Sequence, residues 1–140
     1  MKKAQALINL LRENSRRSVS ELSKKLGVSR TTVQSNMTQL EQQGVIQAYT
    51  IKLNPHYQRQ QVSAYIMISV QPKKTTAVIN HIKKHPKLDM LCTISGQYDL
   101  MAQVTEETTE ALDTCIDHIA GLDGVEKTLS HVVLSRKVDR

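Results

Sequence analysis

The sequence predicts an α+β protein with a helical N-terminal part and a C-terminal part in which strands and helices alternate as β-α-β-β-α-β. Apolar residues recur at helical spacing up to about residue 43 and alternate at every second position from Val62 onward. Residues 1–54 hold nine Lys and Arg against three acidic residues, whereas 55–140 hold ten against ten, so the net charge of +6 resides in the first part. Such asymmetry is typical of a basic module for a polyanion joined to a neutral module.

The first part is predicted to contain three short helices and a tight turn. Ser18 and Glu21 stand three apart, which is the capping-box arrangement at the start of a second helix, and Gly27 ends that helix. Ser29 can cap a third helix, which Gly44 stops in turn. Because only three residues connect the second and third helices, they must cross steeply, as in a helix-turn-helix unit.

A change of period follows the third helix. After Gly44 the apolar residues alternate, and 45–53 are predicted to form a strand where a wing would sit. An Asn-Pro pair then breaks the pattern. The predicted domains are therefore 1–54 and 62–140, joined by a polar linker at 55–61.

Four strands and two helices are expected in the second domain. The strands run from Val62 to Val70, Met90 to Ser95, Tyr98 to Val104 and Lys127 to Arg136, and the helices lie around 78–82 and 112–119. This order predicts an antiparallel sheet with both helices on one face. The uncovered face is expected to carry the apolar residues Tyr65, Met67, Leu91 and Met101. Apolar side chains in the middle of an open sheet indicate an association surface, so we expect a homodimer with a closed two-fold interface.

The third helix has the composition of a DNA-reading surface. No acidic residue occurs between Glu21 and Glu41, although a solvated helix usually mixes both signs of charge. Small polar side chains on its outward face can hydrogen-bond base edges in a major groove, where phosphates would repel an acid. Taken singly, each basic residue also fits a solvated face. The residues expected to contact DNA are Ser29, Arg30, Thr31, Gln34, Ser35 and Thr38, with Arg16, Arg17, Lys24 and Lys25 neutralising flanking phosphates.

The chain resembles the leucine-responsive regulatory protein and asparagine-operon regulator family, Lrp/AsnC, in the stretch ELSKKLGVSRTTVQSNMTQLEQQGVIQAYTIKLNP and in SGQYDL downstream. The match covers nearly the whole chain, and the G-x-Y-D turn inside a β-α-β-β-α-β domain makes it specific. The resemblance implies a winged helix-turn-helix followed by a ferredoxin-like domain that senses an effector and dimerises, often assembling into tetramers or octamers. It implies a transcriptional regulator that binds double-stranded DNA.

The resemblance also implies an amino acid or related small metabolite as effector, bound near Ser95, Gly96, Gln97, Tyr98 and Asp99. Gly96 lets a ligand approach the backbone, and Asp99 could receive an ammonium group. A turn residue that satisfies local amides is an equally good interpretation of Asp99. Tyr98, which lies on the alternating pattern of the next strand, is expected in the core. A regulator or architectural protein of the same fold without an effector is the alternative function.

No catalytic, metal or cofactor site is predicted. His81 and His85 are four apart on an expected helix, but no third ligand is evident nearby in the sequence, so a solvated helix end is favoured. The sequence has no phosphate-binding glycine loop, nucleophile elbow or paired-carboxylate motif, which disfavours an enzyme built on the second domain. An RNA-binding sheet is disfavoured because the chain has no Phe or Trp and only four Tyr to stack on bases.

The cysteines and the apolar runs indicate a cytoplasmic protein. Cys92 and Cys115 share no metal or redox spacing, and both are expected to be buried thiols in a reducing compartment. The longest apolar runs are a few residues, far below the roughly 20 that span a bilayer, so no membrane contact is expected.

Overall fold

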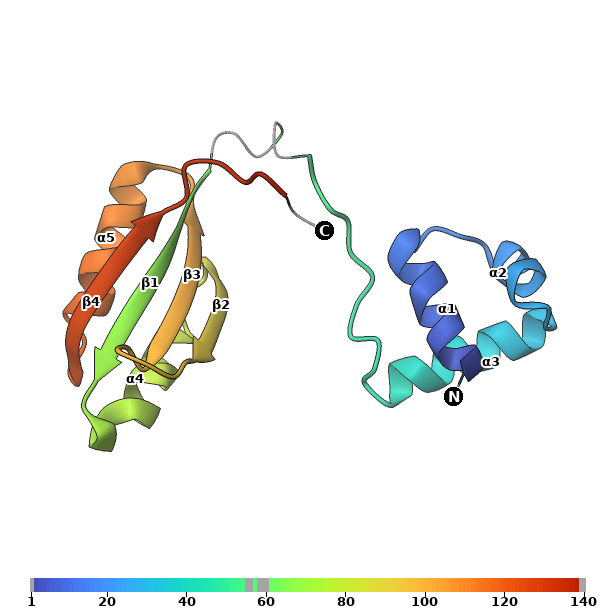
Figure 1. Ribbon diagram of the computed structural model, residues 1–140, viewed down its shortest axis with the longest axis horizontal. Coiled ribbons are helices and arrows are strands. Elements are labelled where there is room, and N and C mark those ends of the chain that lie inside the picture. The colour runs from blue at the N-terminus through green and yellow to red at the C-terminus, as the bar shows by residue number, and fades with distance from the viewer. Residues whose placement is uncertain (1, 55–56, 58–60, 139–140) are drawn as a thin grey trace. The chain divides into compact units, whose positions relative to one another are not determined.

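The computed structural model describes residues 2–54, 57 and 61–138. The chain divides into two compact units, Met1–Lys52 and Leu53–Arg140 (Figure 1). Each unit has its own apolar core, and the two cores share no residue. Most of the predicted linker lies outside the described residues.

The first unit consists of three helices, as the apolar spacing predicted. They are α1 (Lys2–Glu13), α2 (Val19–Leu26) and α3 (Arg30–Gln42). Their inward faces bury a small core made of Leu7, Leu11, Leu22, Val33 and Leu40. Because this core is small, the hydrogen bonds that cap the helix ends contribute a large share of the stability of the unit.

The predicted caps of α2 and α3 are confirmed. Ser18 and Glu21 form the capping box: the Ser18 backbone N–H donates to Glu21 Oε2 at 2.8 Å, and the Glu21 N–H donates to Ser18 Oγ at 3.2 Å. The first of these bonds lowers the pKa of the Glu21 carboxyl. Ser29 Oγ accepts a backbone N–H of the first turn of α3 at 3.1 Å. Gly27 and Gly44 take the left-handed conformation, with φ of 63° and 69°, that ends these helices.

The strand predicted at 45–53 is wrong. This segment has no regular secondary structure, and none of the described residues pairs with it. Val45 and Ile51 are 55% and 75% exposed, and Ile46 packs against the core of the first unit. A segment with an alternating pattern forms a strand only when a neighbouring strand completes its backbone hydrogen bonds. The described residues of this chain do not provide such a neighbour for 45–53.

The second unit has the predicted order β-α-β-β-α-β. Its elements are β1 (Val62–Val70), the 3-10 turn η1 (Pro72–Lys74), α4 (Thr75–Ile82), β2 (Leu88–Thr93), β3 (Leu100–Glu106), α5 (Thr109–Ala120) and β4 (Val125–Val132). The sheet is antiparallel throughout, with the strand order β2-β3-β1-β4 (Figure 1). The two β-α-β halves are thereby interleaved, with β1 and β3 at the centre.

One face of the sheet carries the core of the second unit. Ala64, Ile66 and Ile68 of β1 are fully buried beneath both helices. Val78 and Ile82 of α4 pack into the same cluster as Leu112, Cys115 and Ile119 of α5. The turn before β4 is packed closely enough to require glycine: a Cβ at Gly124, where φ is 100°, would lie 2.6 Å from Lys74 Cβ. Both helices therefore cover the same face, as predicted.

The register of β2 corrects the prediction for the open face. An irregularity between Leu88 and Met90 shifts the pairing with β3 by one residue. Leu91 therefore pairs with Ala102 and packs against the core, whereas Cys92 pairs with Met101 on the open face. The prediction that Leu91 is exposed there is wrong, as is the prediction that Cys92 is buried like Cys115.

Several element ends also differ from the predictions. β2 begins at Leu88 and ends before the predicted Ser95. β4 ends at Val132 rather than at Arg136, although the Val133 N–H still donates to the Ser63 carbonyl of β1 at 2.8 Å. α4 ends at Ile82, so His81 and His85 do not share a helix.

Candidate DNA interface and ligand site

The outward surface of α3 is a continuous polar stripe. Val33 and Leu40 anchor the helix in the core, and this fixes which side chains face solvent. A hollow of about 450 Å³ lies along the exposed side. Its lining recurs every three or four residues, which is one face of a helix. The lining residues are Thr31, Gln34, Ser35, Thr38, Gln39 and Gln42.

Four of the predicted reading residues, Thr31, Gln34, Ser35 and Thr38, lie together in this lining. Arg30 and Ser29 are exposed at the start of α3, where Ser29 also caps the helix. Gln39 and Gln42 were not among the predicted residues, although the helical period that selected Thr31 and Gln34 continues through both. The stripe is uncharged and carries hydrogen-bond donors and acceptors along its whole length.

The flanking basic residues divide into two groups. Arg16, Lys24 and Lys25 are exposed. Arg17 is different, because its guanidinium donates to the Leu10 carbonyl at 2.6 Å and to Glu13 Oε2 at 2.9 Å. With a side chain only 18% exposed, Arg17 fastens the α1–α2 connection to α1. These two bonds give Arg17 a structural role in this unit.

Glu41, near the end of α3, has a structural role. The Tyr49 hydroxyl donates to Glu41 Oε1 at 2.8 Å and holds the segment after α3 against that helix. Partial burial, followed by this hydrogen bond and the negative charge of Glu41, raises the pKa of Tyr49 to about 12. The segment predicted as a strand is thus attached by a side chain rather than by a ladder of backbone bonds.

The predicted ligand residues lie in the connection from β2 to β3. Ser95, Gly96 and Gln97 are exposed, and Gly96, with φ of 123°, has open space where a side chain would begin: a Cβ there would meet no atom within 4 Å. Tyr98 is 9% exposed, as expected for a core residue, and Lys127 Nζ lies 5.6 Å from its ring centroid. The connection therefore combines a buried aromatic anchor with an open, exposed glycine turn.

Asp99 ties this connection to β1. Its backbone N–H donates to the Ile68 carbonyl at 2.9 Å, and its carboxylate Oδ2 accepts the Val70 N–H at 2.9 Å. Its carbonyl accepts the Ile94 N–H at 2.9 Å and closes the turn. Asp99 thus serves as a turn residue, yet the side chain remains exposed and only Oδ2 is used in these bonds.

Comparison with known proteins assigns both units. Residues 2–47 match the winged helix-turn-helix DNA-binding model, and residues 63–140 match the Lrp/AsnC ligand binding domain. An uncharacterised HTH-type transcriptional regulator of Pyrococcus horikoshii is 30% identical over 133 residues, which is 94% of this chain and 84% of that protein. The chain belongs to the Lrp/AsnC family of transcriptional regulators.

Solved structures agree with the fold of this Lrp/AsnC protein. Escherichia coli AsnC superposes with a TM-score of 0.88 at 22% identity, over 100% of this chain and 95% of that one. The feast or famine regulatory protein of Mycobacterium tuberculosis, solved in complex with L-methionine, gives 0.82 at 25% identity over 99% and 94%. The predicted family and α+β architecture are thus confirmed. Within the described residues, no helix is long and apolar enough to cross a membrane.

The Tyr49–Glu41 contact predicts an unusual titration. Because the folded pKa is raised from 10.0 to about 12, the contact stabilises the folded state below about pH 10 and is lost as the pH rises towards 12. Ultraviolet absorbance of phenolate should show one tyrosine that deprotonates late. Tyr49→Phe should remove that late step, and Glu41→Gln should bring it to lower pH. A late step that persists in Tyr49→Phe would contradict the assignment, and Tyr57→Phe is the matched control.

Proposed function

We propose that α3 reads the base edges of duplex DNA with its polar stripe, while Arg16, Lys24 and Lys25 contact the flanking phosphates. The supporting observation is the stripe itself, whose lining residues share one helix face and include no charged group. Arg30 at the helix start is placed to reach either a base or a phosphate. Arg17 is left out of the set because its guanidinium is committed to α1.

Substitutions on the stripe should separate base reading from phosphate contact. We expect Gln34→Ala to weaken binding to a sequence selected from random duplexes by roughly 5- to 100-fold and to leave binding to bulk DNA unchanged. Lys24→Ala should weaken both alike and reduce the salt slope by about one. Fluorescence anisotropy on both DNAs measures these effects. Gln5→Ala, on the exposed face of α1, is the control; equal affinities for Gln34→Ala and Gln5→Ala would contradict the proposal.

The second unit is proposed to bind a free amino acid at the β2–β3 connection. Gly96 leaves room for a ligand at the backbone, and the exposed Asp99 carboxylate retains capacity to receive an ammonium group. A relative of the same fold was solved with L-methionine, which makes amino acids the first ligands to test. Resident cofactors are not part of the proposal.

Two substitutions at Asp99 separate ligand binding from turn formation. Asp99→Asn keeps an oxygen for the Val70 amide but removes the charge, whereas Asp99→Ala removes both. Thermal unfolding across the twenty amino acids should reveal a ligand that raises the midpoint of wild type by mass action. We expect the ligand-free midpoint of Asp99→Asn to stay near that of wild type while its ligand-induced shift is lost. If Asp99→Asn retains the full shift, Asp99 is a turn residue only.

The open face of the sheet is proposed to pair two copies of the chain. Tyr65, Met67, Met101 and Cys92 lie on this face, opposite the helix-covered core. Leu129 of β4 extends the apolar surface and is 44% exposed. Burying this face in a two-fold dimer would remove it from water, and further assembly into tetramers or octamers would use other surfaces. The proposed compartment is the cytoplasm, which suits two free thiols.

A charge placed in the middle of the open face should disrupt the dimer. Met67 lies on the central strand β1 and faces Met101 and Leu129 across its neighbours. Analytical ultracentrifugation should show wild type as a dimer or a multiple of it, and Met67→Glu should shift towards the monomer because an unpaired carboxylate would be buried. Thr76→Glu, on the exposed side of α4, should not change the assembly. A wild-type protein that sediments as a monomer would contradict the proposed interface.

A further inference from the structure

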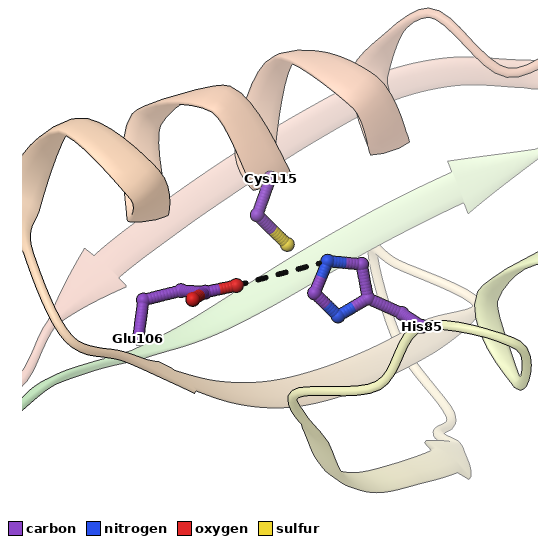
Figure 2. A group of neighbouring side chains, drawn as sticks. All are labelled: His85, Glu106 and Cys115. Carbon is purple, nitrogen blue, oxygen red and sulfur yellow. Dashed lines mark ion pairs between the residues drawn. The ribbon is translucent and has the colours of Figure 1, made fainter.

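A cluster of three potential metal ligands lies on the helix-covered side of the second unit. His85 follows α4, Glu106 is the last residue of β3, and Cys115 lies in the middle of α5. The imidazole, carboxylate and thiol groups each offer one ligand atom, and these atoms all lie within 4.8 Å of one another. Figure 2 shows the Cys115 sulfur and the Glu106 carboxylate directed towards the same edge of the His85 ring.

The contacts among the three groups are loose. His85 Nε2 and Glu106 Oε1 are 3.8 Å apart, which is within reach of an ion pair when the ring is protonated but too long for a hydrogen bond. The side chains of His85 and Glu106 are only 19% and 12% exposed, and Cys115 is 3% exposed. Burial and the Glu106 charge raise the pKa of the Cys115 thiol. A carboxylate withdrawn from water beside a thiol is costly unless a cation or a donor compensates its charge.

We propose that His85, Glu106 and Cys115 form a zinc-binding site. Thiolate sulfur, imidazole nitrogen and carboxylate oxygen are the three ligand types that Zn²⁺ takes in proteins, and a thiolate disfavours Mg²⁺ and Ca²⁺. Ligands at roughly 2.0 to 2.3 Å from a tetrahedral ion lie about 3 to 4 Å from one another, so ligand atoms that now lie up to 4.8 Å apart must approach by up to about 1 to 2 Å. The fourth position is occupied by water, since His85 and Glu106 retain contact with solvent.

The hydrogen bond at the second ring nitrogen of His85 determines which nitrogen carries the proton before the ion binds. Nδ1 accepts the backbone N–H of Lys87 at 3.1 Å, so the proton of the neutral ring is carried by Nε2, which faces Glu106. Zinc requires the Nε2 lone pair. When the ion binds, the ring proton moves from Nε2 to Nδ1, and the thiol proton of Cys115 is released to solvent. The Lys87 N–H then loses its acceptor and must turn away from the protonated Nδ1, a cost set against the three metal–ligand bonds that form.

The ion would join three segments that are distant in the sequence. It would hold the connection after α4 to the end of β3 and to α5. The apolar core beneath both helices includes Cys115 and is otherwise built from side chains that bind no metal, so we expect the unit to fold without the ion. The expected site is therefore an exchangeable brace, and a chelator should empty it without unfolding the protein.

Cobalt binding to the purified full-length protein, freed of metal by a chelator, tests the proposal. We expect one Co²⁺ per chain, with a thiolate-to-cobalt charge-transfer band and the d–d bands of a tetrahedral site, both abolished by added Zn²⁺. Cys115→Ser should lose the charge-transfer band. His85→Gln and Glu106→Gln should each weaken Co²⁺ binding by at least about tenfold. The last two side chains are partly exposed, so these variants keep the test valid if Cys115→Ser fails to fold.

Three matched variants serve as controls. Cys92→Ser changes the thiol on the open face, His81→Gln changes the exposed histidine of α4, and Glu107→Gln changes the exposed neighbour of Glu106. Each should bind Co²⁺ like wild type. The proposal is overturned if wild type takes up no stoichiometric Co²⁺ or Zn²⁺, if the charge-transfer band survives in Cys115→Ser and is lost in Cys92→Ser, or if all six variants bind alike.

Discussion

The four-stranded sheet has two faces, and the described residues of the second unit supply helices for only one of them. α4 and α5 together cover the face that carries Ile66 and Ile68, and the same unit supplies no described helix for the other. A sheet with an apolar second face must obtain cover from outside the fold. Met67 and Met101 lie on this uncovered face, which is the face that we propose a second copy covers.

The same topology separates the two chemical regions of the second unit. In the pairing of β1 with β3, Ile68 lies opposite Leu100, next to Asp99, whereas Val62 lies opposite Glu106. The β2–β3 connection therefore lies at one end of this central pair, and the His85, Glu106 and Cys115 cluster lies at the other. The two regions share the strand β3 but no residue. A ligand at the first and an ion at the second would both act on β3, and neither would occupy the open face.

Local signals made much of the fold predictable, and long-range register made the rest unpredictable. Ser18, Glu21 and Ser29 mark helix starts because their capping hydrogen bonds join residues only three apart in the sequence. The alternation of buried and less buried residues in β1 extends over nearly the whole strand. The placement of Leu91 could not be predicted, because it depends on an irregularity in β2 that shows only in the pairing with β3. The alternation in 45–53 was misleading for a related reason: a pattern of period two does not reveal whether a partner strand exists.

The functional residues divide in the same way. The polar stripe of α3 was largely predictable because all of its members lie on one short helix and follow its period. Arg17 was predicted to contact phosphate from its charge alone, and its bonds to Leu10 and Glu13, which remove it from the proposed set, are visible only in three dimensions. Glu106 and Cys115 were not connected to His85, because the chain brings them together only through the pairing of β3 and the packing of α5.

The composition of α3 is itself an argument for its use. Six of its thirteen residues are Thr, Ser, Asn or Val, which are weaker helix formers than Ala, Leu or Glu. Its first turn has no acid to favour the helix dipole, and its last turn has no base. The helix is held instead by the Ser29 cap, the Gly44 stop and the burial of Val33 and Leu40. A sequence selected only for stability would exchange Thr31, Ser35 and Thr38 for better helix formers at no cost to the core. Their presence on the exposed face, where packing does not require them, therefore points to a requirement outside the fold, and the proposed contact with bases would supply one.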